Sequence, residues 1–398
     1  MPRLSQRALV LQESAIRKLD QRVAQQTGVR FFRVNIGQPD VPTPPPMLDA
    51  ILAFQPKVIG YGPASGLPVT RKAAARYHAQ WCPDLQPEHV AVTTGGSEAL
   101  LFAFTAICDP GDEILVLEPY YTNYNGFATV AGAHIRAVRT HLAQGFAIPP
   151  NDVLDAAVTE RTRAIVFSNP ANPTGAVYDR AEVERLAAWA AQHGLFLIAD
   201  EVYRRIWFDS PPASALELDA FREHVVVIDS MSKTWSACGL RLGFLISRNL
   251  ELMEKVERLG QARLGPQPLA QEVALAALDL PESYYTQVRQ TYQRRVQALT
   301  STLSAVPGVT VPRPAGAFYS MIELPIDDSE RFARWLVEDF RTADGESVIV
   351  APGPGFYADP SQGRQEVRLA AVLDAPLLER AGQVLAEALQ AYPGRSSA

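Results

Sequence analysis

The sequence predicts an α/β protein with two parts: a large domain with a mostly parallel sheet flanked by helices, plus a smaller α+β domain. Short, almost continuously apolar runs alternate with helical or loop stretches through about residues 45–285, which is typical of strands covered on both faces. Beyond residue 285 the order of helices and strands changes. The 398 residues are enough for two domains. We therefore expect a large domain at 45–285 and a small domain from 1–44 and 286–398.

The elements follow in order along the chain. Residues 5–27 predict an amphipathic helix or arm, and residues 38–46 predict a loop because their prolines disfavour both helix and central strand. A long helix is expected to begin near Ser283. The other expected elements are strands at 89–93, 114–117, 135–138, 164–167, 196–199, 225–228 and 242–246, then strands at 309–311, 317–322, 348–350 and 367–371, and helices at 329–340 and 376–391.

Charge and cysteine content argue against several kinds of partner. The formal net charge is −6 and the basic residues form no run, so we expect neither nucleic acid nor an anionic membrane as partner. Three scattered cysteines and six scattered histidines show no metal-ligand spacing, so we expect no metal site, reduced thiols and a cytoplasmic location. The N-terminal segment has no apolar signal core, and no apolar stretch approaches the roughly 20 residues of a membrane span.

A lysine at the end of a predicted buried strand is the strongest indication of chemistry. The apolar run 225–228 leads into Ser230, Ser232 and Lys233, and Arg241 follows shortly after. Lysine rarely sits at such a place without a partner or a task. An amine among hydroxyls and near an arginine fits Schiff-base formation with a phosphorylated aldehyde cofactor, whose phosphate the hydroxyls and the arginine bind.

Two further strand ends carry polar residues that suit a pyridine ring. Asp200 follows a predicted buried strand, where open α/β sheets bind ligands, and its carboxylate would keep a ring nitrogen protonated. Tyr203 and Asn172 would hydrogen-bond an oxygen on the same ring. The alternatives are that Asp200 caps a helix, that Tyr203 is a packing residue, and that the segment with Asn172 is a plain turn.

Two other stretches suit the phosphate and the ring face. Gly96 and Ser97 lie where a strand runs into an apolar helix, and glycines at a helix N-terminus expose N–H groups to phosphate. The pattern is neither GxGxxG nor a Walker loop, so it disfavours dinucleotide or ATP binding. Tyr121 ends another strand and presents an aromatic face for stacking. The alternatives are an ordinary strand-to-helix turn and a packing tyrosine.

Together these strings resemble the class I/II aminotransferases of the fold-type I pyridoxal-phosphate enzymes. The resemblance runs from Asn35–Asp40 to Val367–Leu369, and its most specific parts are Asn-Pro-Ala-Asn-Pro-Thr-Gly at 169–175, Asp-Glu-Val-Tyr at 200–203, and Ser-Met-Ser-Lys at 230–233 with Arg241 beyond it. It implies the fold-type I architecture and pyridoxal 5'-phosphate as cofactor.

The resemblance also implies a role for each matching residue. Lys233 would be the Schiff-base lysine and proton-transfer base, Asp200 the partner of the pyridine nitrogen, and Tyr121 the stacking ring. Asn172 and Tyr203 would bind the phenolic oxygen. Gly96, Ser97, Ser230, Ser232 and Arg241 would hold the phosphate. Gly37 and Arg368 would bind the substrate α-carboxylate. Tyr61 matches the tyrosine that reaches the phosphate of a neighbouring subunit, which implies a homodimer with shared active sites.

The implied reaction is ping-pong transfer of an amino group from an L-amino acid to a 2-oxo acid such as 2-oxoglutarate. The strings at 95–100 and 120–128 favour aspartate, while aromatic, alanine and other donors remain open. Ser97 stands where one dicarboxylate-specific branch has a lysine. Arg263 lies near the place where another branch has an arginine that crosses from the partner subunit, and its alternative is an exposed arginine at a helix end. A C–S lyase or cyclising synthase would share all these residues. A non-catalytic cofactor-binding regulator would need an N-terminal DNA-binding domain, for which the segment before Gly37 is too short.

Overall fold

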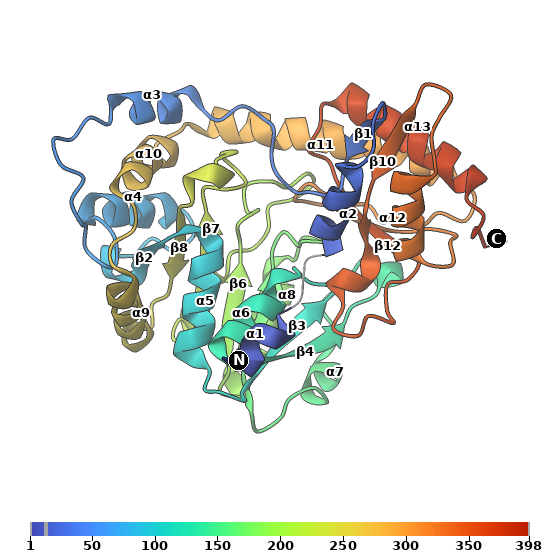
Figure 1. Cartoon of the computed structure of the whole chain (residues 1–398). Coiled ribbons are helices and arrows are strands. Elements are labelled where there is room, and N and C mark those ends of the chain that lie inside the picture. The colour runs from blue at the N-terminus through green and yellow to red at the C-terminus, as the bar shows by residue number, and fades with distance from the viewer. Residues whose placement is uncertain (1, 12–14, 397–398) are drawn as a thin grey trace.

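A seven-stranded sheet forms the centre of the molecule in the computed structural model, which describes residues 2–11 and 15–396 (Figure 1). Its strands lie in the order β2-β8-β7-β6-β5-β3-β4. Their bounds are β2 Val90–Thr93, β3 Glu113–Glu118, β4 His134–Arg139, β5 Thr162–Ser168, β6 Phe196–Asp200, β7 Val225–Ser230 and β8 Gly243–Ile246. Each of the seven strands predicted for the large domain therefore forms, with ends shifted by a few residues.

Most of this sheet is parallel. The neighbours β7, β6, β5, β3 and β4 pair in parallel, whereas β8 runs antiparallel to both β7 and β2. In register, Ser168 of β5 pairs with Asp200 of β6, and Asp200 pairs with Ile228 of β7. The ends of these three strands therefore meet at one edge, where an open parallel sheet binds ligands. The predicted α/β fold class is confirmed.

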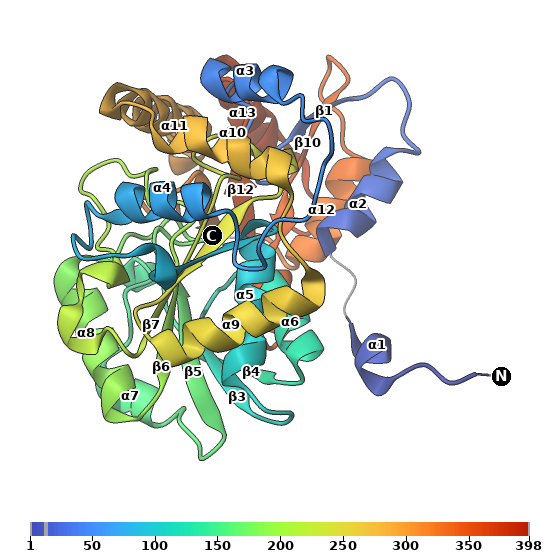
Figure 2. The same cartoon turned by 90° about the vertical axis from the view of Figure 1, so that its left-hand side faces the viewer.

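Helices bury both faces of the sheet, and alternate strand residues divide between the two faces. Ile198, Val226 and Ile228 pack in the core that contains α5, whereas Leu197 and Val227 pack in the core that contains α4 and α8. Figure 2 shows α4 and α8 on one side and α5, α6 and α9 on the other. The helices around this sheet are α3 Pro45–Ala53, α4 Pro68–His78, α5 Gly95–Ile107, α6 Asn123–Ala131, α7 Asn151–Asp155, α8 Arg180–Gln192, α9 Leu250–Arg263 and α10 Pro268–Leu278.

The remaining strands form two small sheets from the two ends of the chain. β1 (Arg30–Arg33) pairs in parallel with β10 (Glu346–Ile349), and β12 (Glu366–Ala370) lies between β11 (Ala351–Pro352) and β9 (Tyr319–Glu323). The helices here are α1 Gln6–Val10, α2 Ala15–Val23, α11 Glu282–Ser304, α12 Ser329–Glu338 and α13 Ala375–Ala391. The predicted domain boundaries stay a prediction, although the strands of the large sheet all lie within 45–285.

Three details differ from the predicted elements. The segment expected as a strand at 309–311 contributes only an isolated bridge between Thr310 and Glu323. The proline-rich loop is shorter than predicted, because Pro45 and Pro46 form the first turn of α3, where a missing N–H is not needed for the helix. The predicted N-terminal helix is described as α1 and α2, and residues 12–14 lie outside the described residues. No helix in the described part of the chain has the length and apolar character to cross a membrane.

Candidate active site

A cavity of about 240 Å³ opens at the edge where β5, β6 and β7 end. Four of the residues that line it come from outside the predicted set: Leu100, Val202, Cys238 and Tyr319. The other ten are Gly96, Ser97, Tyr121, Asn172, Asp200, Tyr203, Ser230, Ser232, Lys233 and Arg241, all predicted from the sequence.

The N-terminus of α5 forms one end of this cavity. Gly95 has a φ of +77°, which glycine adopts without steric penalty, and a Cβ on it would lie 2.7 Å from Nη2 of Arg241. Arg241 therefore lies against the first turn of α5, where the N–H groups are unpaired and the helix dipole is positive. Hydroxyl and backbone groups line the same end: Gly96, Ser97, Ser230 and Ser232. This end is suited to bind an anion.

Asp200 ends β6 as a buried carboxyl group. Its Oδ2 accepts a hydrogen bond of 2.8 Å from the Tyr124 hydroxyl, and its Oδ1 is buried without a partner among the described residues. Burial raises the pKa of Asp200 to about 6, and the hydrogen bond from Tyr124 acts in the opposite direction. A free, buried carboxylate oxygen of this kind suits a cationic N–H donor.

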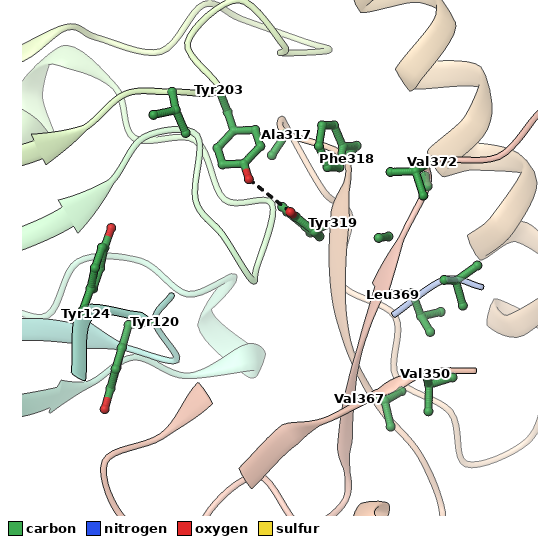
Figure 3. Packing of buried hydrophobic residues seen from close by; sticks show 14 of the residues in the cluster. Tyr120, Tyr124, Tyr203, Ala317, Phe318, Tyr319, Val350, Val367, Leu369 and Val372 are labelled. Atoms are coloured by element: carbon green, nitrogen blue, oxygen red, sulfur yellow. Dashed lines mark hydrogen bonds between the residues drawn. The ribbon is translucent and has the colours of Figure 1, made fainter. Parts of the chain in front are cut away.

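Tyr203 and Tyr319 connect the large sheet to the C-terminal part of the chain. Their hydroxyls are hydrogen-bonded at 3.1 Å, and their rings meet edge to face with centroids 5.6 Å apart. Figure 3 marks this hydrogen bond with a dashed line. Tyr319 also approaches Gly37 so closely that a Cβ there would lie 1.6 Å from its hydroxyl oxygen. Glycine at position 37 therefore makes room for the Tyr319 hydroxyl beside the cavity.

Arg368, on β12, is a buried cation near the cavity. Its guanidinium lies between the rings of Tyr319 and Phe356, at 4.5 and 4.9 Å from their centroids. Its Nη2 donates to the carbonyl of Asn35 at 2.6 Å and its Nη1 donates to Oδ1 of Asn172 at 3.1 Å. Its Nε has no partner among the described residues. The fixed guanidinium and the free N–H suit a carboxylate ligand.

Lys233 lies between these groups. Its Nζ donates to the carbonyl of Gly37 at 2.8 Å and lies within 6 Å of the ring centroids of Tyr203 and Phe318. None of the described carboxylates forms an ion pair with it within 4.0 Å. Its amine is therefore available for chemistry.

Tyr121 lies on the cavity wall with its ring edge-on to Tyr124 at 5.5 Å, and its hydroxyl accepts from Nδ2 of Asn123 at 2.8 Å. Burial raises the pKa of Tyr121 to about 12. The ring is therefore neutral and available for stacking.

Two predicted residues lie away from the cavity of their own chain. Tyr61 is 87% exposed. The Arg263 side chain is only 19% exposed, so the alternative of an exposed helix-end arginine does not describe it. Arg263 pairs with Glu98 and donates to the carbonyl of Ala64 at 2.8 Å.

Two residues of the site received no role from sequence reasoning. Tyr124 lies three residues beyond Tyr121, in the first turn of α6, but nothing in the sequence indicated that it reaches Asp200. Tyr319 lies on a strand that the sequence predicts. Its contacts with Gly37 and Tyr203 join three distant segments, which no local pattern reveals.

A model of the family described as "Aminotransferase class I and II" matches residues 30–384. The chain belongs to this family. Among its class I and II relatives, the aspartate/prephenate aminotransferase of Thermus thermophilus is 32% identical over 83% of this chain and 85% of that protein. A probable aspartate/prephenate aminotransferase of Thermus aquaticus is 31% identical over 97% of this chain and 99% of that protein. The solved aspartate aminotransferase of Thermotoga maritima has a TM-score of 0.89 at 28% identity and covers 97% of this chain and 100% of that one.

Class I and II aminotransferases use pyridoxal phosphate, and the cavity fits that cofactor. The end formed by α5 and Arg241 would hold the phosphate. The free Oδ1 of Asp200 would accept from the protonated pyridine nitrogen, and the free Nε of Arg368 is suited to the carboxylate of a substrate. The chain is therefore a pyridoxal-phosphate-dependent transaminase.

The substitution Tyr124→Phe tests the environment of Asp200. Loss of the hydroxyl donor removes an interaction that lowers the Asp200 pKa, so this pKa should rise further above about 6. Ionised Asp200 is the form that would hold a proton on the ring nitrogen, so activity should be lost at a higher pH as the solution is acidified. We expect the acid limb of kcat/KM to move upward by up to about one pH unit, equivalent to about 1.4 kcal/mol.

Tyr120→Phe is the matched control for this change. Tyr120 stacks in parallel on Tyr124 at 6.3 Å, but its hydroxyl donates to Asn125 rather than to Asp200. An equal shift in both variants would contradict the role assigned to the Tyr124 hydroxyl.

Proposed function

We propose that this transaminase takes an amino group from L-aspartate and passes it to a 2-oxo acid such as 2-oxoglutarate, by a ping-pong mechanism that depends on Lys233. The supporting observation is a lysine amine without a carboxylate partner among the described residues, in a cavity with a site for an anion at α5 and near a free guanidinium N–H of Arg368. An amino acid carries an amine and a carboxylate on one carbon, so this arrangement suits it. When bound, pyridoxal phosphate forms a Schiff base with an amine and accepts the negative charge that develops at the substrate Cα.

The residues of this chain would divide the remaining work. Arg368 would orient the substrate through its carboxylate, so that the Cα proton faces Lys233. Once its hydrogen bond to the Gly37 carbonyl is broken, the Lys233 amine would take that proton as a general base and later return it. Asp200 would hold the proton on the ring nitrogen throughout, and Asn172 and Tyr203 would hydrogen-bond the ring oxygen. Tyr121 would stack on the ring face.

The relatives support aspartate as donor. Relatives named aspartate aminotransferase occur in Streptomyces avermitilis at 32% identity and in Thermotoga maritima at 30% identity, beside the two Thermus proteins. Within this chain Ser97 occupies the place of a carboxylate-reading lysine, so the distal carboxylate needs another cation. We propose Arg263 of a partner subunit for that role, because it ends α9 next to the segment that contains Tyr61.

We further propose a homodimer with shared active sites. The surface near Tyr61 exposes apolar side chains, including Val58 at 79% and Ile59 at 71%, and the α3 residue Leu52 at 75%. Large apolar side chains exposed together along one short segment favour association. Tyr61 on that surface would reach the phosphate held by the second copy. We also propose a cytoplasmic location, since all three cysteines are free thiols, and cell fractionation against a cytoplasmic marker tests it.

The basic activity is tested with a panel of amino donors and 2-oxoglutarate. The wild-type protein should be yellow, form glutamate and give parallel initial-velocity lines, whereas Lys233→Ala should lose at least about 10³-fold in turnover because the proton-transfer base is gone. Lys255→Ala, at a half-exposed lysine of α9, is the control and should match wild type. Release of ammonia and a 2-oxo acid without an acceptor would favour the lyase alternative.

The role of Arg263 is tested by comparing two donors. Arg263→Ala should raise KM for aspartate by about 30-fold, near 2 kcal/mol, because an ion-paired hydrogen bond to the distal carboxylate is lost. KM for alanine should change little. Arg258→Ala, an exposed arginine on the same helix, is the control. Equal effects on the two donors would sink the aspartate assignment.

Shared active sites are tested by mixing two defective proteins. Tyr61→Ala and Lys233→Ala each damage both sites of their own homodimer. A hybrid dimer places both intact residues at one site and both substitutions at the other, so refolding an equal mixture should restore about a quarter of wild-type activity. Light scattering checks the dimer mass. A mixture no more active than the sum of its parts would contradict sharing through Tyr61.

A further inference from the structure

A fully buried cluster of charged residues lies on the side of the sheet away from the cavity. Arg204 contacts two carboxylates: its Nη1 lies 3.2 Å from Glu201 and its Nη2 lies 3.0 Å from Asp229. The guanidinium also lies 4.2 Å from the ring centroid of Trp81. These contacts are closed to solvent, since the side chains of Arg204 and Glu201 are only 2% and 1% exposed. One arginine therefore joins the ends of two neighbouring strands.

Each carboxylate of the cluster is the chain neighbour of a cavity residue. Glu201 follows Asp200 at the end of β6, and Asp229 precedes Ser230 at the end of β7. Successive residues of a strand point to opposite faces. Accordingly Asp200 and Ser230 line the cavity, whereas Asp229 contacts His78 of α4 on the other face. Fixing Glu201 and Asp229 relative to each other therefore fixes Asp200 relative to Ser230.

Burial raises the pKa of Glu201 to about 7, and its contacts with Arg204, Ala215 and Ser214 act in the opposite direction by favouring the carboxylate. Its Oε1 accepts from the backbone N–H of Ala215 at 2.7 Å, and its Oε2 accepts from the Ser214 hydroxyl at 2.8 Å and pairs with Arg204. The backbone N–H of Glu201 itself donates to the carbonyl of Ile228 at 2.9 Å, which extends the pairing of β6 with β7 by one residue.

His78 of α4 contacts one carboxylate of this cluster. Its Nδ1 lies 2.8 Å from the carbonyl of Ala74, so Nδ1 carries hydrogen. Its Nε2 lies 3.0 Å from Oδ2 of Asp229, and a hydrogen bond there needs a second proton on one of the two atoms. Burial lowers the pKa of His78 and so disfavours that proton, while the hydrogen bond with Asp229 acts in the opposite direction. Arg204 is the permanent cation that contacts both carboxylates.

We propose that Arg204, with Glu201, Asp229 and His78, forms a clamp that positions Asp200 and Ser230 for cofactor binding from the opposite face of the sheet. Arg204 is not among the residues that line the cavity, so it is a positioning residue. The inference rests on the proposed function of Asp200 and Ser230. A guanidinium is required because its rigid fork reaches two carboxylates at once, which a single ammonium group does not.

Arg204→Lys tests the clamp. It keeps the positive charge but loses the second contact, so Asp200 and Ser230 should shift relative to each other. We expect the affinity of the cofactor-free protein for added pyridoxal phosphate to fall about tenfold and kcat to fall by about 10- to 100-fold, as for small misplacements of a catalytic group. KM for 2-oxoglutarate should change little because Arg368 lies on a different strand. The pH midpoint of the visible absorption of the bound cofactor should also move.

Arg205→Lys is the matched control. Arg205 is the next residue in the chain and also packs on an aromatic ring, at 3.8 Å from the centroid of Tyr285, but it pairs with Glu282 of α11 rather than with the strand ends. Asp229→Asn is a second test variant that keeps the side-chain shape while removing the charge. Melting temperatures of all variants separate general destabilisation from repositioning.

The outcomes are distinct. The clamp is supported if Arg204→Lys and Asp229→Asn both change the affinity for pyridoxal phosphate and the pH midpoint of its absorption, while Arg205→Lys matches wild type in both. If both variants titrate and bind cofactor as Arg205→Lys does, or if neither folds, the positioning role is overturned. If wild-type protein itself neither binds pyridoxal phosphate nor transfers amino groups, the proposed function fails instead.

Discussion

The parallel pairing of β5, β6 and β7 is the constraint on which the site depends. It brings Asn172, Asp200 and Lys233 to one edge of the sheet, although they are far apart in the sequence. Both faces of these strands are covered by apolar cores, so their register cannot slip without exposing buried side chains. The positions of the polar groups at the strand ends are thus set by apolar burial elsewhere, which allows those groups to be arranged for binding rather than for stability.

The site contains polar atoms that the folded chain leaves without partners. Oδ1 of Asp200 and Nε of Arg368 are buried and unpaired among the described residues. Each such atom costs about 1–3 kcal/mol in an apolar environment. A cofactor and a substrate carboxylate would supply the missing partners, so binding would recover part of that free energy. At the proposed clamp, Arg204 contacts both carboxylates, although its own Nε is also buried without a partner among the described residues.

Local patterns in the sequence were sufficient for much of the fold. Apolar runs predicted all seven strands of the large sheet, because a strand buried on both faces must be apolar along its length. The strand predicted at 309–311 is wrong. This segment is partly exposed, so burial does not stabilise a strand there, and only Thr310 forms a bridge. The start of α3 was also missed, since prolines that break a helix interior are compatible with its first turn.

The sequence by itself determined the α/β class and the residue types of the site, because most of the site residues lie at or just beyond the end of a strand, or at the start of a helix, that the apolar pattern reveals. Only the tertiary structure decided which atoms meet: Tyr124 with Asp200, Tyr319 with Gly37 and Tyr203, Arg263 with Glu98, and Arg204 with two strand ends. These contacts join segments whose separation along the chain carries no information about their separation in space. They arise when packed layers bring side chains together, and a one-dimensional pattern records periodicity but not such encounters.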